Sequence, residues 1–396
     1  MIEKLITKID EADLHQLVNE KTREGRFIEY KRLIDEDTQE ICADISSFAN
    51  TNGGDLVYGI ADVDGAADEL IGIPKPIDQQ IQRIENTIKR NIFPRIPQPQ
   101  FQSIELVNGN VALIVRINKS WIGPHSVQSK SGNSYRMYGR TSSGKFLFDE
   151  SEIRRAYRMA EGGREQIRSW VNRRIELLVE NKGEMPTQLS PRLAIHLVPA
   201  SAYVTESRID AKSLMDTFAH FRPNQSGNRD YRINLDGFIV YCQTNHEDPR
   251  ISGYSQFYTN GCIEIVDARF FGMRAENAIA SIWFENQILA LATESLNGLK
   301  QLGINTPIYL FTSMIDANGI RMAFNNPLNE NEHGIDRNPL VLPEIILESY
   351  DIDLGTALRP VFDSTWNACG YIRSFNYNES GERTVDKHGK RINSDR

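Results

Sequence analysis

The chain has 396 residues, of which 40% are hydrophobic and 25% are charged, the composition of an ordinary globular protein. At roughly 150 residues per domain, this length predicts two or three domains. No apolar run approaches the roughly 18 residues of a membrane span, and the N-terminus lacks the apolar core of a signal peptide. The scattered cysteines, without a CxxC pair, argue against a zinc site or a disulfide framework and fit a reducing compartment. We therefore expect a cytoplasmic protein.

Charge is unevenly distributed along the chain. The formal net charge is −8, yet the segment 116–174 contains 13 Lys and Arg against 5 Asp and Glu. The sequence thus has a basic middle within an acidic body. A basic segment is the electrostatic signature of nucleic-acid binding, although a solvated helix face carries the same residues.

The first third of the chain alternates between helix and strand signals. Apolar residues from Ile41 to Ala49 recur at the spacing of one helical stripe. Asp37 or Thr38 can cap its start, and the turn 50–54 can end it. The other predicted elements are a helix at 12–21, a strand at 27–31, a strand at 56–61, a helix at 79–91, and strands at 100–106, 111–117 and 134–138. This order predicts an α+β or mixed α/β domain.

A further helix is predicted to begin at Asp149, because Glu152 three residues later completes a capping box. We expect Gly162 and Gly163 to interrupt it before a second helical stripe, which consists of Ile167, Val171, Ile175 and Leu178. A long core helix is predicted at 276–302. The expected organisation is a first domain at 1–160, a helical connector and linker at 161–189, a second domain at 190–375, and a mobile polar tail at 376–396.

Acidic residues gather around two strands of the first domain. Glu29 and Lys31 are two residues apart on a strand, so both side chains leave the same face. Glu24 lies five residues before Glu29 and must join them from a turn, and Asp62 follows the next strand. Such carboxylates are either solvated surface groups or ligands of a divalent cation that offsets their repulsion.

Three strings in register resemble the Schlafen AlbA-like domain family. They are EGRFIEYK at 24–31, FANTNGG at 48–54 and LVYGIAD at 56–62. The resemblance continues through Pro124-His125 and Tyr135-Arg136 to the segment 152–154, and it covers about residues 15–160. Because several motifs occur in the same order, the resemblance is specific, which a single ExK would not be.

The resemblance implies a metal-dependent nuclease that acts on structured RNA. The two glutamates and one aspartate of the family fall on Glu24, Glu29 and Asp62, with Lys31 beside them, and would hold Mg²⁺ or Mn²⁺. Such a cation lowers the pKa of a bound water and polarises a phosphate, while a lysine steadies developing charge. Asp64 is an alternative third ligand, because it lies in the same loop as Asp62.

Basic and aromatic residues after position 130 are candidates for RNA contact. Arg136, Tyr138 and Arg140 alternate along one strand and share a face, and Lys145 follows in the next segment. Guanidinium groups for phosphates beside an aromatic ring suit RNA, although an edge strand with a polar outer face has the same pattern.

Two further features have alternative interpretations. The turn 50–54 could simply end its helix, or its glycines could let the chain approach a phosphate closely. Trp121 and His125 could stack on a base or act as a general acid, whereas a single histidine after a proline is more commonly structural. The chain contains neither GxxxxGKS nor GxxxxGKT, so a nucleotide-hydrolysing phosphate loop has no support.

The sequence predicts an α+β protein, in which a Schlafen AlbA-like domain precedes a mixed α/β domain that senses a ligand, binds a partner or assembles the protein. We expect an endoribonuclease acting on structured RNA such as tRNA, and the resemblance implies a role in antiviral defence or growth arrest. The alternative is a non-catalytic, nucleic-acid-binding transcriptional regulator. Because the motif occurs once, we expect a homodimer or higher oligomer to complete the RNA-binding surface. The stripe from Ile167 to Leu178 could pack such a pair, or it could pack within one protomer.

Overall fold

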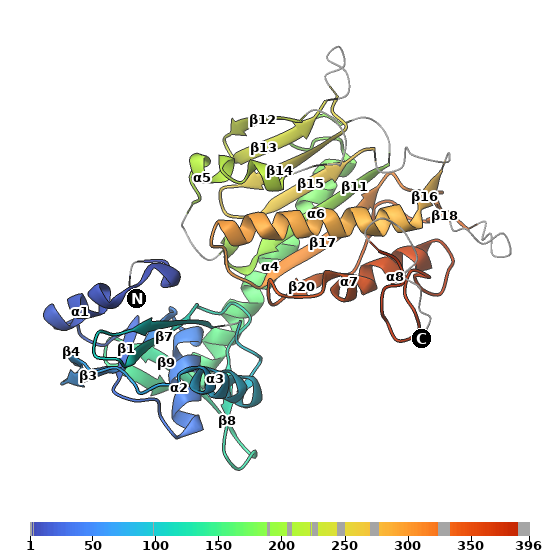
Figure 1. Ribbon diagram of the computed structural model, residues 1–396. Helices are drawn as coiled ribbons and strands as arrows, with labels where there is room; N and C mark the ends of the chain where they lie inside the picture. The colour runs from blue at the N-terminus through green and yellow to red at the C-terminus, as the bar shows by residue number, and fades with distance from the viewer. Residues whose placement is uncertain are drawn as a thin grey trace. The chain divides into compact units, whose positions relative to one another are not determined.

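The structure is a computed structural model that describes residues 2, 4–97, 99–187, 191–203, 208–221, 223, 229–243, 250–269, 277–323 and 333–386. The chain divides into two units, Met1–Gly163 and Arg164–Arg396 (Figure 1). Both units contain helices and strands, which confirms the predicted α+β class.

Unit 1 contains two small sheets and a hairpin. Its helices are η1 (Ile6–Lys8), α1 (Glu11–Asn19), α2 (Thr38–Asn50), α3 (Asp78–Asn91) and the first half of α4 (Glu150–Val179). Its strands are β1 (Ile28–Lys31), β2 (Gly54–Tyr58), β3 (Ile60–Val63), β4 (Ala66–Leu70), β5 (Ile92–Phe93), β6 (Gln100–Glu105), β7 (Val111–Ile117), β8 (Ser126–Gln128), β9 (Tyr135–Thr141) and β10 (Gly144–Leu147). The sheets have the strand orders β1-β2-β7-β6 and β10-β9-β8-β5, and β3 pairs with β4.

The central strands β2 and β7 of the β1-β2-β7-β6 sheet are buried on both faces. Alternation along β2 places Leu56 and Tyr58 in the cluster formed with α2 and α3, and Val57 in the cluster formed with α1. Burial on both faces explains why β2 is apolar at nearly every position. The predicted stripe from Ile41 to Ala49 is buried against the same sheet, so α2 is a core helix.

Helix α2 begins and ends where the sequence predicts. The side chain of Asp37 accepts a hydrogen bond from the backbone N–H of Gln39 at 2.9 Å, which makes Asp37 the N-cap and Thr38 the first helical residue. At the other end, the N–H of Gly53 donates to the carbonyl of Phe48 at 2.9 Å. The local capping signals therefore locate this helix correctly.

Helix α4 is continuous, so the predicted interruption at Gly162 and Gly163 is wrong. The predicted capping box is present: the N–H of Glu152 donates to Asp149 Oδ1, and the N–H of Asp149 donates to Glu152 Oε2, both at 2.8 Å. Each glycine costs a helix about 1 kcal/mol relative to alanine. Burial of the later stripe, from Ile167 to Leu178, outweighs that cost.

Unit 2 is built around one large sheet, whose described strand pairs are all antiparallel. Its strands are β11 (Arg192–Pro199), β12 (Arg229–Asn234), β13 (Gly237–Cys242), β14 (Gly253–Tyr258), β15 (Ile263–Asp267), β16 (Ala278–Ala280), β17 (Ile308–Ile315), β18 (Arg321–Ala323), β19 (Leu340–Val341) and β20 (Ile345–Leu347). Its helices are the second half of α4, η2 (Ala200–Tyr203), α5 (Ala211–Met215), η3 (Phe218–His220), α6 (Ser281–Gln301), α7 (Leu354–Ala357) and α8 (Arg359–Ala368). The sheet order is β12-β13-β14-β15-β11-β17-β19, with β20 also paired to β17.

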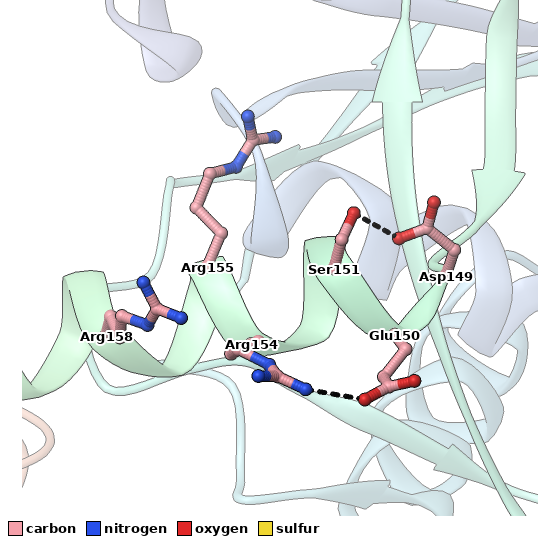
Figure 2. Close-up of a pocket in the computed structure, with 6 residues that line it drawn as sticks. All are labelled: Asp149, Glu150, Ser151, Arg154, Arg155 and Arg158. Atoms are coloured by element: carbon pink, nitrogen blue, oxygen red, sulfur yellow. Dashed lines mark hydrogen bonds and ion pairs between the residues drawn. The ribbon is translucent and has the colours of Figure 1, made fainter.

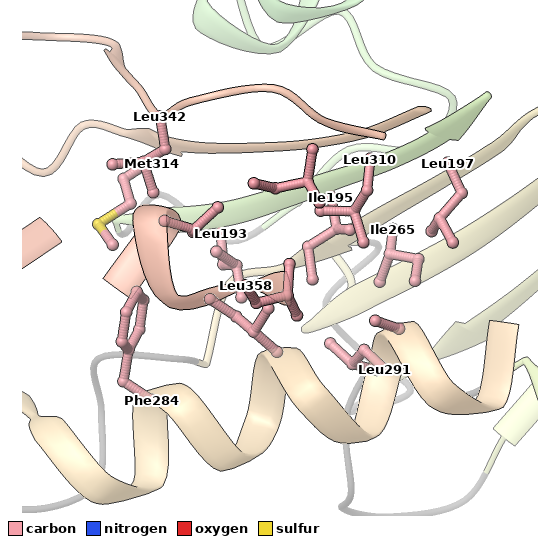
Figure 3. Packing of buried hydrophobic residues seen from close by; sticks show 14 of the residues in the cluster. Leu193, Ile195, Leu197, Ile265, Phe284, Leu291, Leu310, Met314, Leu342 and Leu358 are labelled. Carbon is pink, nitrogen blue, oxygen red and sulfur yellow. The ribbon is translucent and has the colours of Figure 1, made fainter. Parts of the chain in front are cut away.

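Helices cover both faces of this sheet. Alternate residues of β11, such as Leu193 and Ile195, join Phe284 and Leu291 of α6 in the main hydrophobic core (Figure 3). The intervening residue Ala194 belongs to a second cluster with Leu178 of α4. The period-two alternation of one strand thus accounts for the three layers of the unit.

The second half of α4 is part of unit 2 and does not form a separate connector. The division of the chain falls between Gly163 and Arg164, three residues beyond the predicted end of the first domain. The stripe from Ile167 to Leu178 is at most 4% exposed, because it packs inside one protomer. It is therefore not available to pack two copies together.

The C-terminal segment is more ordered than its composition predicts. Asn376, Tyr377 and Val385 are buried, so the described part of the predicted mobile tail packs onto unit 2, while 387–396 lie outside the described residues. The long helix predicted at 276–302 begins only at Ser281, because residues 278–280 form β16, and position 276 also lies outside the described residues.

The four cysteines are free and buried, in agreement with a chain that has no disulfide framework. Across the described ranges, every helix is either too short or too polar to cross a lipid bilayer.

A buried polar network joins α4 to the sheet of unit 2. Glu264, with no exposed surface, accepts hydrogen bonds from Arg174 at 2.8 and 2.7 Å and from the hydroxyl of Tyr254 at 2.7 Å. His196 lies 3.0 Å from the same carboxylate. Burial acts to raise the pKa of Glu264, but the bonds from Arg174 and His196 outweigh it and lower the pKa to about 2.

We predict that Arg174→Leu lowers the free energy of unfolding by about 3–5 kcal/mol, because it leaves the charge of Glu264 buried without its cation. Arg173→Leu is the matched control: Arg173 is exposed, and its salt bridge in the described part of the chain is with the exposed Glu176 one turn along, so its loss should cost less than about 0.5 kcal/mol. Urea denaturation of both variants makes the comparison. Equal stabilities of the two variants would contradict the structural role of the buried pair.

Candidate functional site

Glu24 lies in the loop that joins α1 to β1, and the loop is fixed at both ends. The N–H of Glu24 donates to the carbonyl of Gly65 at 2.6 Å, in the turn between β3 and β4. The N–H of Tyr30 donates to Glu24 Oε1 at 2.8 Å. Glu24 therefore reaches the acidic cluster from a turn, as its odd spacing from Glu29 requires.

Glu24 and Asp62 are brought together around Gly65. The N–H of Gly65 donates to Asp62 Oδ2 at 3.2 Å, and a Cβ at Gly65 would lie 3.6 Å from Glu24 Oε2. Burial is the main cause that raises the pKa of Glu24, and the charge of the exposed Asp62 raises it further. The hydrogen bond from Tyr30 offsets only part of this. A cation at this position would relieve the repulsion between the two carboxylates.

Glu29 is neutralised by two cations. Its Oε2 accepts a hydrogen bond from Arg140 Nη2, and its Oε1 lies 3.2 Å from Lys31 Nζ. Arg140 also donates from Nε to the carbonyl of Gly25 at 2.8 Å, and its side chain has no exposed surface. Burial lowers the pKa of Arg140 to about 10, against the opposing effect of Glu24, so the guanidinium remains charged at neutral pH.

A fourth carboxylate, Asp44 of α2, completes the network, and the sequence motifs do not identify it. Asp44 has no exposed surface; its Oδ1 accepts from Lys145 Nζ at 2.8 Å, and its Oδ2 lies 3.5 Å from Lys31 Nζ. Burial raises the pKa of Asp44, while Lys145 and Lys31 act to lower it. Its position on the apolar stripe between Ile41 and Phe48 is the signal that could have found it, because a buried acid needs a partner.

The carboxylates of this centre differ in their ability to bind a metal ion. Glu29 and Asp44 are paired with lysine and arginine, whereas Glu24 and Asp62 form no ion pair within the described ranges. No three acidic, histidine or cysteine side chains of the described residues are placed to hold a metal ion. The predicted set of Glu24, Glu29 and Asp62 thus fits a metal only in part. Mg²⁺ needs one or two protein carboxylates and keeps several waters, which Glu24 and Asp62 satisfy.

The sequence of unit 1 matches a known domain family over most of its length. Residues 24–148 match the family model of the Schlafen, AlbA_2 domain. The match includes all four acids of the centre and both lysines, and it lies within the predicted range 15–160.

Two solved structures are similar to the chain over 36% of its length. The DIP2311 protein from Corynebacterium diphtheriae is 18% identical, with a TM-score of 0.25, and the match covers 30% of that structure. The N-terminal domain of a protein related to the ATP-dependent DNA helicase RecG, from Nitrosomonas europaea, is 22% identical, with a TM-score of 0.26 and 96% coverage. The chain thus spans less than a third of the first of these structures. No curated protein matches the chain.

Of the four side chains predicted to contact RNA, Arg136 alone is exposed without an ion pair in the described structure of the AlbA_2 domain. Tyr138 packs against the hydrophobic core. Arg140 and Lys145 are held by the carboxylates described above, so they are not free to bind phosphates. This corrects the assignment of Arg140 and Lys145, because alternation along a strand does not show which positions lie beside an acid of another element. RNA contact by Arg136 stays a prediction.

The turn 50–54 of the AlbA_2 domain is a helix end that packs tightly against the rest of the domain. Gly53 has φ +72°, and a Cβ there would lie 2.7 Å from the backbone nitrogen of Lys119. A Cβ at Gly54 would lie 2.4 Å from the ring of Phe48. Both glycines are required by the chain's own packing, which favours the structural interpretation of this turn.

His125 is a structural residue of the domain. It is fully buried, and its Nδ1 lies 2.7 Å from the carbonyl of Pro94. Burial lowers the pKa of His125 to about 4, although the hydrogen bond with Pro94 acts in the opposite direction. The imidazole is therefore neutral at physiological pH and out of contact with solvent, which excludes it as a general acid.

The first turns of α4 present arginines beside a surface hollow of about 690 Å³ (Figure 2). Arg154 pairs with Glu150 at 2.6 Å. Arg155 and Arg158 form no salt bridge with described residues, and in Figure 2 Arg155 extends away from Arg154. These residues account for part of the basic segment noted in the sequence.

We predict that the buried imidazole of His125 makes the protein sensitive to mild acid. Its pKa of about 4 in the folded state is below the ordinary value of 6.5, so its contribution is fully present above about pH 6.5 and is lost as the pH falls toward 4. Between about pH 7 and pH 5, this group alone should lower the free energy of unfolding by about 2 kcal/mol. Urea denaturation of wild type and His125→Asn at both pH values tests this. An equal loss in the two proteins would contradict it.

Proposed function

We propose that the chain is a metal-dependent endoribonuclease that cleaves a structured RNA, such as tRNA, at the acidic pair Glu24 and Asp62. An AlbA_2 domain indicates a function connected with nucleic acids. The observation that supports metal-dependent cleavage is that the four carboxylates are neutralised to different degrees. Glu29 and Asp44 are balanced by the chain's own cations, while Glu24 and Asp62 repel one another around Gly65.

The residues around the pair fix it in place for chemistry at a phosphate. The backbone N–H of Tyr30 orients the carboxylate of Glu24, and the N–H of Gly65 orients that of Asp62. Mg²⁺ or Mn²⁺ held by the two carboxylates would supply a bound water of lowered pKa and polarise the scissile phosphate. Such a cation would satisfy the charge that burial and repulsion leave uncompensated at Glu24.

Glu29 has a different role from the one the family pattern implies. With one oxygen on Arg140 and the other near Lys31, it is a positioning residue that holds two cations beside the reaction centre. Lys31 stays charged: burial acts to lower its pKa, but Asp44 and the neighbouring acids Asp35 and Glu40 outweigh that effect and raise it. The retained positive charge of Lys31 favours the approach of a polyanion to the acidic pair.

A non-catalytic, nucleic-acid-binding regulator is the second candidate function. The ion pairs of Glu29 with Arg140 and Lys31 favour a regulator, because they leave two acids instead of three to bind a metal ion. In a regulator, the exposed cations such as Arg136 would bind the phosphate backbone, and the charges of Glu24 and Asp62 would be dispensable.

We predict that Glu24→Gln and Asp62→Asn each lower the rate of RNA cleavage by at least about 10²-fold, the usual effect of losing a positioned catalytic group. Folding should be retained, because glutamine can still accept the hydrogen bond from Tyr30 and asparagine the bond from Gly65. The measurement is cleavage of total tRNA by the full chain with Mg²⁺ or Mn²⁺, followed over time on denaturing gels.

Asp64→Asn is the matched control for this experiment. Asp64 is exposed in the same turn and has φ +52°, a conformation that asparagine tolerates. It should retain wild-type cleavage, whereas loss of activity in Asp64→Asn but not in Asp62→Asn would assign the second ligand to Asp64. Wild-type rates in both Glu24→Gln and Asp62→Asn would refute the proposed centre. RNA binding without cleavage under either metal would favour the regulator.

A further inference from the structure

A second concave site lies in unit 1, apart from the carboxylates of the acidic pair. It is a cavity of about 530 Å³, within the size range of small-molecule sites. The end of α2, the loop 119–124 after β7, the strands β9 and β10, and the first turns of α4 enclose it. Segments far apart in the sequence thus converge on one hollow, which a solvated helix face would not produce.

Three cations without salt-bridge partners in the described structure line this cavity: Arg26, Lys119 and Arg155. The single carboxylate among the described lining residues is Glu152, and it accepts the backbone N–H of Asp149 as part of the helix cap. Burial lowers the pKa of Lys119, and no carboxylate counters that effect. The cavity therefore has positive charge that the protein itself does not neutralise, which favours an anion.

Aromatic rings occupy the same cavity. Lys119 Nζ lies 4.2 Å from the ring centroid of Trp121, which is partly exposed. Phe146 and Phe148 contact each other, with ring centroids 5.7 Å apart. Phe148 is held close to the backbone of β9, because a Cβ at Gly139 would lie 2.1 Å from its ring. The aromatic wall is thus anchored, and its flat faces suit a planar heterocycle.

We propose that this cavity binds one nucleotide unit, with the base on the aromatic wall and the phosphate on Lys119 and Arg155. A nucleotide joins a base to a phosphate through a sugar, so it can use both an aromatic ring for stacking and free cations for its phosphate. The same unit can come from a free mononucleotide or from a nucleotide within an RNA chain. The proposal does not depend on cleavage, because none of the lining residues belongs to the acidic pair.

The cavity is nevertheless adjacent to the acidic centre through Arg140. The residue lines the cavity, while its guanidinium holds Glu29. If the nucleotide unit belongs to an RNA chain, the cavity would hold a nucleotide near the phosphate that reaches Glu24 and Asp62, and would set the position of cleavage.

Equilibrium dialysis and calorimetry with the full chain test the proposal, with 5′-AMP, inorganic phosphate and a decamer of uridine as probes. EDTA is present throughout, and the Asp62→Asn background removes cleavage. Trp121→Ala should weaken binding by about tenfold, because it removes the ring on which the base stacks. Lys119→Gln should also weaken it by about tenfold, because it removes a cation from the phosphate. Trp121→Phe should retain most of the affinity. Arg158→Gln is the matched control, because Arg158 is on the same helix as Arg155 but does not line the cavity.

Each outcome decides the question. Binding of 5′-AMP that depends on Trp121 and Lys119 supports the proposal with a free nucleotide as ligand. Binding of the decamer alone, with the same dependence, supports it with a nucleotide of a chain. Phosphate binding as tight as that of 5′-AMP would overturn the assignment of a base site. The absence of binding to both nucleotide probes would also overturn it. The same holds if Arg158→Gln and Lys119→Gln lower the affinity equally while Trp121→Phe and Trp121→Ala leave it unchanged.

Discussion

The ion pair between the buried guanidinium of Arg140 and the partly buried carboxylate of Glu29 is the interaction on which the arrangement of unit 1 depends. The guanidinium lies over the ring of Phe48 at 4.3 Å, bonds the carbonyl of Gly25 and pairs with Glu29. One side chain of β9 therefore ties together the end of α2, the loop before β1 and β1 itself. A buried guanidinium is costly without an anion, so Glu29 has a structural role as the partner of Arg140. Glu24 and Asp62 are then the carboxylates left to bind a metal ion.

The same principle of unequal neutralisation separates the two sites of the domain. At the acidic centre, carboxylates exceed their cationic partners, so the site attracts a cation. At the cavity beside α4, cations exceed carboxylates, and aromatic rings add flat apolar surface. An RNA chain offers both complements, since its phosphates bind cations directly and bind carboxylates through a metal ion. The two sites are thus compatible with one polyanionic ligand, although each is tested separately.

Local sequence patterns predicted most helices and strands. The partners of the charged residues could not be predicted in this way, because they lie far away in the sequence. The cap at Asp37, the capping box at Asp149 and the strand predicted at 111–117 follow from local sequence, and the structure confirms them. The approach of Glu24 to Asp62 requires the backbone bond from Glu24 to Gly65, which no spacing rule contains. For the same reason, the sequence indicated an RNA-binding role for Arg140, although its side chain is buried and pairs with Glu29. The predicted interruption of α4 at Gly162 and Gly163 was wrong because the effect of helix propensity is weak compared with that of burial.

A double-mutant cycle on Arg140→Met and Glu29→Gln tests the central claim most directly. The free energy of unfolding is measured by urea denaturation for wild type, both single variants and the double variant. The account predicts a coupling energy of at least about 2 kcal/mol, because Glu29→Gln leaves the buried guanidinium of Arg140 without its anion, whereas the double variant removes that charge as well. Additive effects, within about 0.5 kcal/mol, would contradict it. In that case Glu29 would be free to act with Glu24 and Asp62 as a third ligand.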